Sequence, residues 1–170
     1  MRHWRRLGAI FATLCALGAQ AAFSQSTKTL DLSLTEVDIR FNRAARQLNS
    51  HLTLELEGCE TKEKSVCRYK VSESLQVLAV SEAAGRNLSQ LVAIYVQGAG
   101  GSAREAVLLQ ETLIAMLAPD MSASERSQLV AYLIGYIDQG RRAQKSIDGL
   151  RYRMQASAKT GLWMYIEPTD

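Results

Sequence analysis

Residues 52–71, LTLELEGCETKEKSVCRYKV, hold two alternating runs on either side of a charged loop that begins at Cys59 and ends at Cys67. Every second residue from Leu52 to Leu56 is leucine, and the second run alternates in the same way after the loop. A period of two is typical of a strand with one wet face. The stretch therefore predicts a β-hairpin with its two cysteines flanking the turn.

The N-terminal segment has the order of a secretory signal peptide. Three arginines come first, an apolar run over 7–17 follows, and small residues close the segment near Ala21. The apolar run is shorter than the roughly 20 residues that a membrane-spanning helix needs. We therefore expect a signal peptide over 1–21, with cleavage as late as 24 as an alternative, and a retained membrane anchor as the alternative to cleavage. The mature chain is expected in the periplasm or outside the cell, without a membrane span.

Removing this segment changes the charge balance. It takes away three of the 20 lysines and arginines and leaves 17 basic residues against 17 acidic ones. A chain without net charge gives no electrostatic reason to expect nucleic acid as a partner. Residues 22–170 contain two prolines and no repeat or linker, and their number suits a single domain.

The redox compartment favours a disulfide between Cys59 and Cys67. Cys15 belongs to the signal segment, so an exported chain retains an even pair of cysteines. Two thiolates without a nearby histidine are too few for a metal site, and seven intervening residues do not match a thioredoxin-type redox motif. Because Cys59 has the opposite parity to the leucines before it, the pairing also predicts either a bulge at Gly58 or a departure from strand geometry.

Capping boxes mark the starts of three helices. A serine followed three residues later by glutamate occurs at Ser33, Ser102 and Ser122. With the apolar spacing that follows each box, this pattern predicts helices over 34–49, 103–117 and 123–138.

Apolar alternation predicts five strands, over 52–56, 67–79, 88–96, 150–156 and 162–166. The third of these runs is apolar on both faces, which suits a central position. The predicted fold class is α+β, in the order α-β-β-β-α-α-β-β. We expect a five-stranded antiparallel sheet with the helices packed on one face.

Two motifs suggest chemistry, and their context weakens both. Gly98-Ala-Gly-Gly-Ser-Ala103 fits the dinucleotide fingerprint, but the acidic residue about 20 positions on is Asp120, in a turn between two helices. A connecting loop is expected, with a small-anion site at the helix start as the alternative. His51 is the one histidine after the signal, and no nucleophile-elbow motif accompanies it. A surface or capping histidine is expected, and a hydrolase that uses His51 is the weaker alternative.

Three further features are expected to be surface features. Glu55 and Glu57 share a strand face without apolar neighbours that would raise a pKa, and Asn87 begins an N-linked glycosylation sequon. Basic residues outnumber acids near the C-terminus, which indicates either a binding patch or a solvated face. They are Arg141, Arg142, Lys145, Arg151, Arg153 and Lys159.

The cysteine loop carries one partial likeness. A disulfide-closed loop on a small exported α+β domain resembles the arrangement in the periplasmic inhibitors of vertebrate lysozyme. In that family the loop carries a histidine that enters the cleft of the target enzyme, whereas residues 59–67 are longer and contain no histidine. The resemblance covers these nine residues and transfers no site.

The last two strands predict a binding surface. If residues 157–161 form a five-residue turn, Arg153 faces Tyr165 and Gln155 faces Trp163 on the side away from the core. Trp, Tyr and Arg are the side chains that dominate interface energetics. We therefore predict a partner-binding or self-association surface anchored by Arg151, Arg153, Trp163 and Tyr165. A cross-strand ladder that serves the fold alone is the alternative.

The sequence thus favours an exported, non-enzymatic domain that binds a macromolecular partner, as an inhibitor, an immunity-type protein or an envelope accessory factor does. No catalytic residue, cofactor or metal is expected. The alternative from another class is a carrier of a small apolar or amphipathic ligand between the sheet and the helices.

Overall fold

The computed structural model of the chain describes residues 28–82, 87–96, 102–138, 142–157 and 161–169. These residues form an α+β fold with three α-helices, one short 3-10 helix and a seven-stranded antiparallel sheet. None of the helices among them is long and apolar enough to cross a membrane. The predicted signal peptide and both predicted cleavage positions lie outside the described residues.

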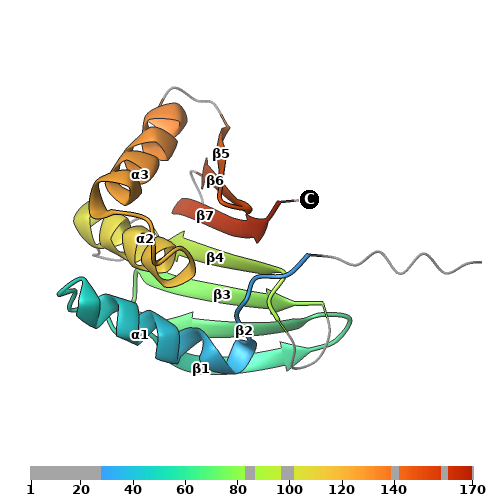
Figure 1. Cartoon of the computed structure of the whole chain (residues 1–170). Helices are drawn as coiled ribbons and strands as arrows, with labels where there is room; N and C mark the ends of the chain where they lie inside the picture. The colour runs from blue at the N-terminus through green and yellow to red at the C-terminus, as the bar shows by residue number, and fades with distance from the viewer. Residues whose placement is uncertain (1–27, 83–86, 97–101, 139–141, 158–160, 170) are drawn as a thin grey trace, which may run out of the picture.

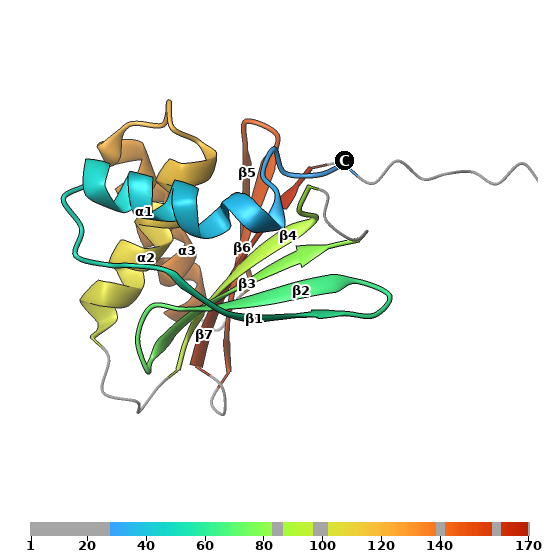
Figure 2. The same cartoon turned by 90° about the horizontal axis from the view of Figure 1, so that it is seen from below.

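The helical elements are η1 (Leu34–Glu36), α1 (Val37–Gln47), α2 (Ala103–Leu117) and α3 (Ala123–Asp138). The strands are β1 (Glu55–Thr61), β2 (Ser65–Lys70), β3 (Leu75–Ser81), β4 (Gln90–Tyr95), β5 (Ala143–Ile147), β6 (Leu150–Ser157) and β7 (Gly161–Pro168). They lie in the order β1-β2-β3-β4-β7-β6-β5, with every neighbouring pair antiparallel. The three α-helices lie on one side of this sheet (Figures 1 and 2).

The general α+β class is confirmed, but the predicted five strands and their order are wrong. One cause is the run 67–79, which forms two strands, β2 and β3, in place of one. The backbone turns back at Ser72, where the amides of Val71 and Ser72 both donate to the carbonyl of Leu75. Serines favour such turns because their hydroxyls bond to nearby backbone groups, and they overrode the apolar alternation.

The second cause is β5, which the apolar pattern missed. This edge strand is largely polar, and its apolar residues Ala143 and Ile147 are too far apart to show a period of two. The turn to β6 did carry a signal. Asp148 and Gly149 both have positive φ, of 50° and 78°, as the tightest hairpin turn requires, and an Asp-Gly pair is its usual sequence.

The ends of two N-terminal elements also differ from prediction. β1 begins three residues later than expected and continues through the cysteine. Its start is delayed because the Asn42 side chain bonds to the backbone N–H and C=O of Leu54, which are then not free to pair with another strand. The Asn42 amide accepts from the Leu54 N–H at 2.8 Å and donates to its carbonyl at 3.1 Å. The first helix opens as the 3-10 turn η1 and ends at Gln47. The bounds of α2 and α3 match the prediction.

The core lies between the helices and the sheet face that they cover. Phe41 of α1, Leu113 of α2 and Leu133 of α3 are fully buried, as are the strand residues that face them. Tyr152 and Met164 are among these strand residues. β4 is the fourth of the seven strands, which confirms its predicted central position. Burial of these side chains supplies the main favourable free energy of folding.

Serine–glutamate pairs close the helix starts. The Ser102 amide donates to the Glu105 carboxylate and the Glu105 amide donates to the Ser102 hydroxyl, and Ser122 and Glu125 form the same reciprocal pair. At η1 the Glu36 carboxylate accepts from both the hydroxyl and the amide of Ser33. These bonds, the hydroxyl first, lower the pKa of Glu36 from its ordinary 4.5 to about 2.

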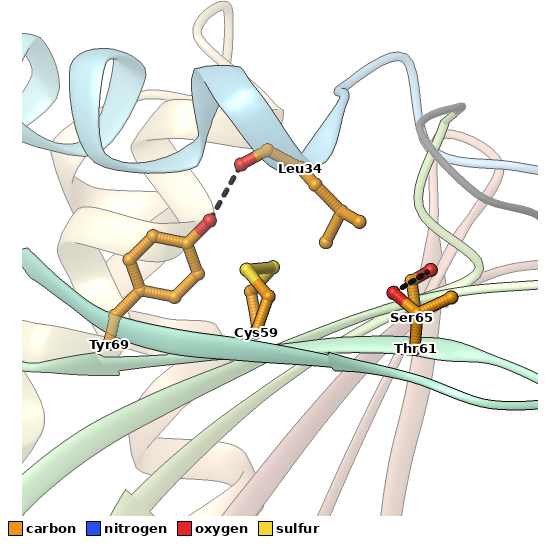
Figure 3. Close-up of a disulfide and its surroundings, with 6 residues drawn as sticks. Leu34, Cys59, Thr61, Ser65 and Tyr69 are labelled. Atoms are coloured by element: carbon orange, nitrogen blue, oxygen red, sulfur yellow. Dashed lines mark hydrogen bonds between the residues drawn. A yellow bond between two sulfur atoms is a disulfide. The ribbon is translucent and has the colours of Figure 1, made fainter.

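The disulfide joins directly opposed residues of β1 and β2. Cys59 and Cys67 are bonded, their Cα atoms are 4.0 Å apart, and the register shifts between Leu56 and Gly58, which confirms the predicted bulge. Figure 3 shows the disulfide on the side of the sheet that faces the helix. There the neighbouring Tyr69 hydroxyl donates to the Leu34 carbonyl at 2.6 Å (Figure 3), and burial raises the pKa of Tyr69 to about 12.

Replacing both cysteines by alanine is expected to lower the free energy of unfolding by about 2 to 3 kcal/mol, because the disulfide closes a short loop. The far-UV circular dichroism spectrum should keep its shape, since most of the core lies on other elements. Denaturant titration of the oxidised wild type, the reduced wild type and the variant checks this. Two free thiols in the intact mass of exported protein would contradict the pairing.

Glu36 is expected to contribute to acid sensitivity. Because its pKa is lowered in the folded state, its stabilisation is complete above about pH 4.5 and is lost as the pH falls towards 2. The Glu36→Gln variant should therefore melt below the wild type at neutral pH and approach it in acid. Thermal melts across this pH range test the prediction, and a constant difference at every pH would contradict it.

Candidate functional site

A cleft of 680 Å³ lies beside the start of α2, and His51 contributes to its lining. Its lining includes His51, Ser102 and Glu105, three residue types that form hydrolase triads. The His51 Nε2 atom lies 3.5 Å from a Glu105 carboxylate oxygen. The fold therefore brings together a hydroxyl, an imidazole and a carboxylate that are far apart in the sequence.

The hydrogen bonds show that Ser102 and Glu105 serve as a helix cap. The Ser102 hydroxyl accepts the Glu105 amide at 3.1 Å, and the hydrogen bonds described for it do not include one to His51. The His51 side chain is 71 % exposed, so water competes for its contact with Glu105. The hydrogen bond from the Ser102 amide, followed by the contact with His51, lowers the pKa of Glu105. A half-buried carboxylate with a lowered pKa is a poor general base.

Other sequence candidates are dispersed. Most of the glycine-rich fingerprint, residues 98–101, lies outside the described residues, as do Arg141 and Lys159 of the basic segment. Asn87 is exposed. Within the described part of the chain, no three His, Cys, Asp or Glu side chains are grouped so that they could hold a metal ion.

The edge strand β1 carries an acidic surface. Glu55, Glu57 and Glu60 are all exposed on it. The bulge leaves Glu57 without a partner on β2, because Leu56 pairs with Tyr69 and Gly58 already pairs with Arg68. A hollow of 450 Å³ opens there, and its lining includes Glu57, Glu60 and Arg68.

The β6–β7 hairpin brings three of the four predicted anchor residues together. Its register has Arg153 opposite Tyr165 and Gln155 opposite Trp163, as predicted. The Arg153 guanidinium lies 4.5 Å from the centre of the Tyr165 ring, and the Trp163 and Tyr165 rings stack at 6.2 Å. The Gln155 amide donates to the Tyr165 hydroxyl at 3.0 Å. The result is a pre-ordered aromatic and cationic cluster.

Arg151 lies beside this cluster and has a different partner. Its Nε atom donates to the Glu167 carboxylate at 3.0 Å, and the other oxygen of that carboxylate accepts from the Gln90 amide at 3.1 Å. Arg151 and Arg153 both lie on the sheet face that turns away from the helices, since Tyr152 between them is fully buried in the core.

The same face carries an apolar surface that the sequence analysis missed. Leu78 of β3 pairs with Val92 of β4, which pairs with Tyr165, and Ile94 pairs with Trp163. Val92 and Ile94 are 3 % and 7 % exposed, yet they do not belong to the core under the helices. We call the following six residues the open-face patch: Leu78, Val80, Val92, Ile94, Trp163 and Tyr165. The unbroken apolar run Val77-Leu-Ala-Val80 was a signal of this surface.

The fold and this surface define a small α+β domain with one helix-covered and one open sheet face. Comparison with known proteins does not assign the domain to a family. No family model matches the sequence, and no curated protein or solved structure matches it significantly.

Replacing His51 by alanine is expected to leave the melting temperature unchanged within about 1 °C, because an exposed ion pair contributes little. It is also expected to leave biological function intact, since Ser102 and Glu105, which line the same cleft, are paired with each other as a helix cap. Thermal melting and a functional assay in the native host check both points. A variant that keeps its stability and loses its function would identify the cleft as the working site.

Proposed function

We propose that this chain is an exported, non-enzymatic domain that binds a protein partner through the open face of its sheet. The observation that carries the proposal is the open-face patch. In an antiparallel sheet with one face covered, the other face normally alternates to polar residues. Here Leu78 and Val80 of β3, and Val92 and Ile94 of β4, turn apolar side chains away from the helices.

A contiguous apolar surface favours a docked partner. Val92 and Ile94 are already shielded from water, and the half-buried side chains around them, Leu78, Val80, Trp163 and Tyr165, keep apolar area that a partner can bury. The patch has apolar residues at its centre, and arginines and glutamates lie around it. An apolar centre with a polar rim is the usual anatomy of a protein interface.

The aromatic cluster supplies the anchor. Trp163 and Tyr165 are stacked on each other, and Arg153 is held over one of the rings. Side chains that are already ordered lose little conformational entropy when a partner binds. The Arg153 Nε atom is buried and has no hydrogen-bond partner among the described residues.

Export is supported by the disulfide, because such bonds persist in oxidising compartments. The predicted kinds of function, an inhibitor, an immunity-type protein or an envelope accessory factor, all use a protein-binding surface of this sort. The surface itself does not distinguish among them.

Two buried atoms favour the alternative of a small-ligand carrier. The Tyr152 hydroxyl and the Gln110 side-chain oxygen are buried without a hydrogen-bond partner in the described part of the chain. Burial also raises the pKa of Tyr152 to about 12. A polar group of a ligand between the sheet and the helices could pair with them. The proposal is better supported, because large buried side chains fill this space.

Removing the anchor with Trp163→Ala and Arg153→Ala together is expected to weaken partner binding at least about tenfold, as loss of an interface hot spot does. The melting temperature should also fall, because the variant loses a cation–π contact worth about 0.5 to 1 kcal/mol and the packing of the half-buried Trp163 ring on Tyr165. Native mass spectrometry of protein purified from its own host checks this, with a stoichiometric protein expected on the wild type.

The matched control is Tyr132→Ala with Lys145→Ala. It removes another cation–π pair, at 5.1 Å, that lies on the helix side of the sheet, and it should leave partner binding unchanged. Unchanged binding in the anchor variant, together with lower stability, would mean that the aromatics serve only the fold. A co-purifying small molecule in place of a protein would support the carrier.

A further inference from the structure

We infer that the partner on the open face is a second copy of this chain, packed face to face about a two-fold axis parallel to the strands. The inference rests on the proposed function, since it uses the same surface, and it adds the identity of the partner. It follows from how the apolar and charged side chains are distributed across the strands.

An apolar centre on neighbouring strands fixes the position of the axis. Leu78 and Val80 lie on β3, and Val92 and Ile94 lie on its neighbour β4. A two-fold axis between these strands places β3 of one copy over β4 of the other. Leu78 of one copy then lies over the row of Val92 of the other, and the half-buried Leu78 and Val80 supply the apolar area that the two copies bury against each other. Two packed sheets about 10 Å apart, with nearly aligned strands, are a common arrangement.

The same axis brings opposite charges together. In the order β1-β2-β3-β4-β7-β6-β5 it exchanges β1 with β6 and β2 with β7. Glu60 and Arg151 lie in one cross-strand row. It runs from Glu60 through Val66 and Val80 to Gln90, whose side chain bonds to Glu167, the residue opposite Arg151. Rotation about an axis parallel to the strands does not change the position of a residue along the strands, so a row of one copy lies over the same row of the other. The glutamate of each copy is therefore placed over the arginine of the other.

The next row gives a second complementary contact. Arg68, Leu78, Val92 and Tyr165 follow one another across β2, β3, β4 and β7. Exchange of β2 with β7 places Arg68 over Tyr165 of the second copy, where a cation–π contact is favourable. The acidic hollow at Glu57 and Glu60 comes over the β6 strand that carries Arg153.

This self-complementarity points to a second copy. A two-fold interface requires one surface to carry both halves of every contact, whereas a foreign partner requires only one half. The sheet edges are less suited to pairing between copies. Glutamates and a bulge protect the β1 edge from pairing. If the β5 edges of two copies paired, Lys145 of one copy would lie opposite Lys145 of the other, and the like charges would repel each other.

The mass of the full chain, purified after export, tests the assembly. Light scattering is expected to give twice the mass of one chain at micromolar concentration. Leu78→Arg, at the centre of the patch, is expected to give a single-chain mass. The matched control is Ile39→Arg, which changes an apolar residue on α1 that is 57 % exposed and should remain a dimer.

A charge exchange tests the two-fold arrangement itself. Glu60→Arg alone and Arg151→Glu alone each place like charges together twice, and each is expected to weaken dimerisation at least tenfold. An equimolar mixture of the two variants should recover the dimer, because both contacts between the unlike chains then join opposite charges. Thermal melts of each variant show whether it is folded, which matters for Arg151→Glu because it also loses the contact with Glu167.

The outcomes separate this inference from the proposed function. A wild-type chain that keeps a single-chain mass at every concentration overturns the second copy. If a different protein then binds the wild type and not the Trp163→Ala, Arg153→Ala variant, the proposed function stands. If no association of any kind depends on the open face, both fail. A dimer that survives Leu78→Arg and both charge reversals overturns this arrangement.

Discussion

Three helices packed on one side leave half of a seven-stranded sheet to be stabilised without them. On the covered face, β4 and its neighbours contribute side chains to a continuous core with α1, α2 and α3. On the open face, Val92 and Ile94 are nevertheless almost completely buried. Their cross-strand neighbours on this face include Leu78 of β3 and Tyr165 and Trp163 of β7. The open face then becomes the surface where further burial is available to a partner.

The bulge at Gly58 links the covered face to the open one. By adding one residue to β1, it reverses the facing of the chain so that Cys59 lies opposite Cys67 on the helix side. The same extra residue turns Glu57 towards a hollow on the open side. One local irregularity thus serves both the disulfide and the acidic end of the open face, which is consistent with the common use of bulges to re-aim side chains.

Two surfaces compete as the site of function, and they differ in how their polar groups are used. At the start of α2, Ser102 and Glu105 satisfy each other as a helix cap, and His51 stays in water. On the open face, Trp163, Tyr165 and Arg153 are ordered by one another beside an apolar surface. Groups that already satisfy one another in a cap have little left for chemistry, whereas ordered aromatics next to apolar strands still have area to bury.

The sequence by itself determined the features that depend on neighbouring residues. The capping boxes set the starts of α2 and α3, and the parity of Cys59 indicated a bulge or another departure from strand geometry. The pairing of Arg153 with Tyr165 followed from the sequence only under an assumed turn length, which the observed register agrees with. The tertiary structure decided the rest, because it depends on distant partners. β1 starts late because the Asn42 side chain bonds to the backbone of Leu54. β5 forms an edge strand because it pairs with β6, although its sequence has little apolar pattern. Which apolar residues of β3 and β4 face the helices was likewise settled by strand order, since alternation cannot reveal which face a helix covers.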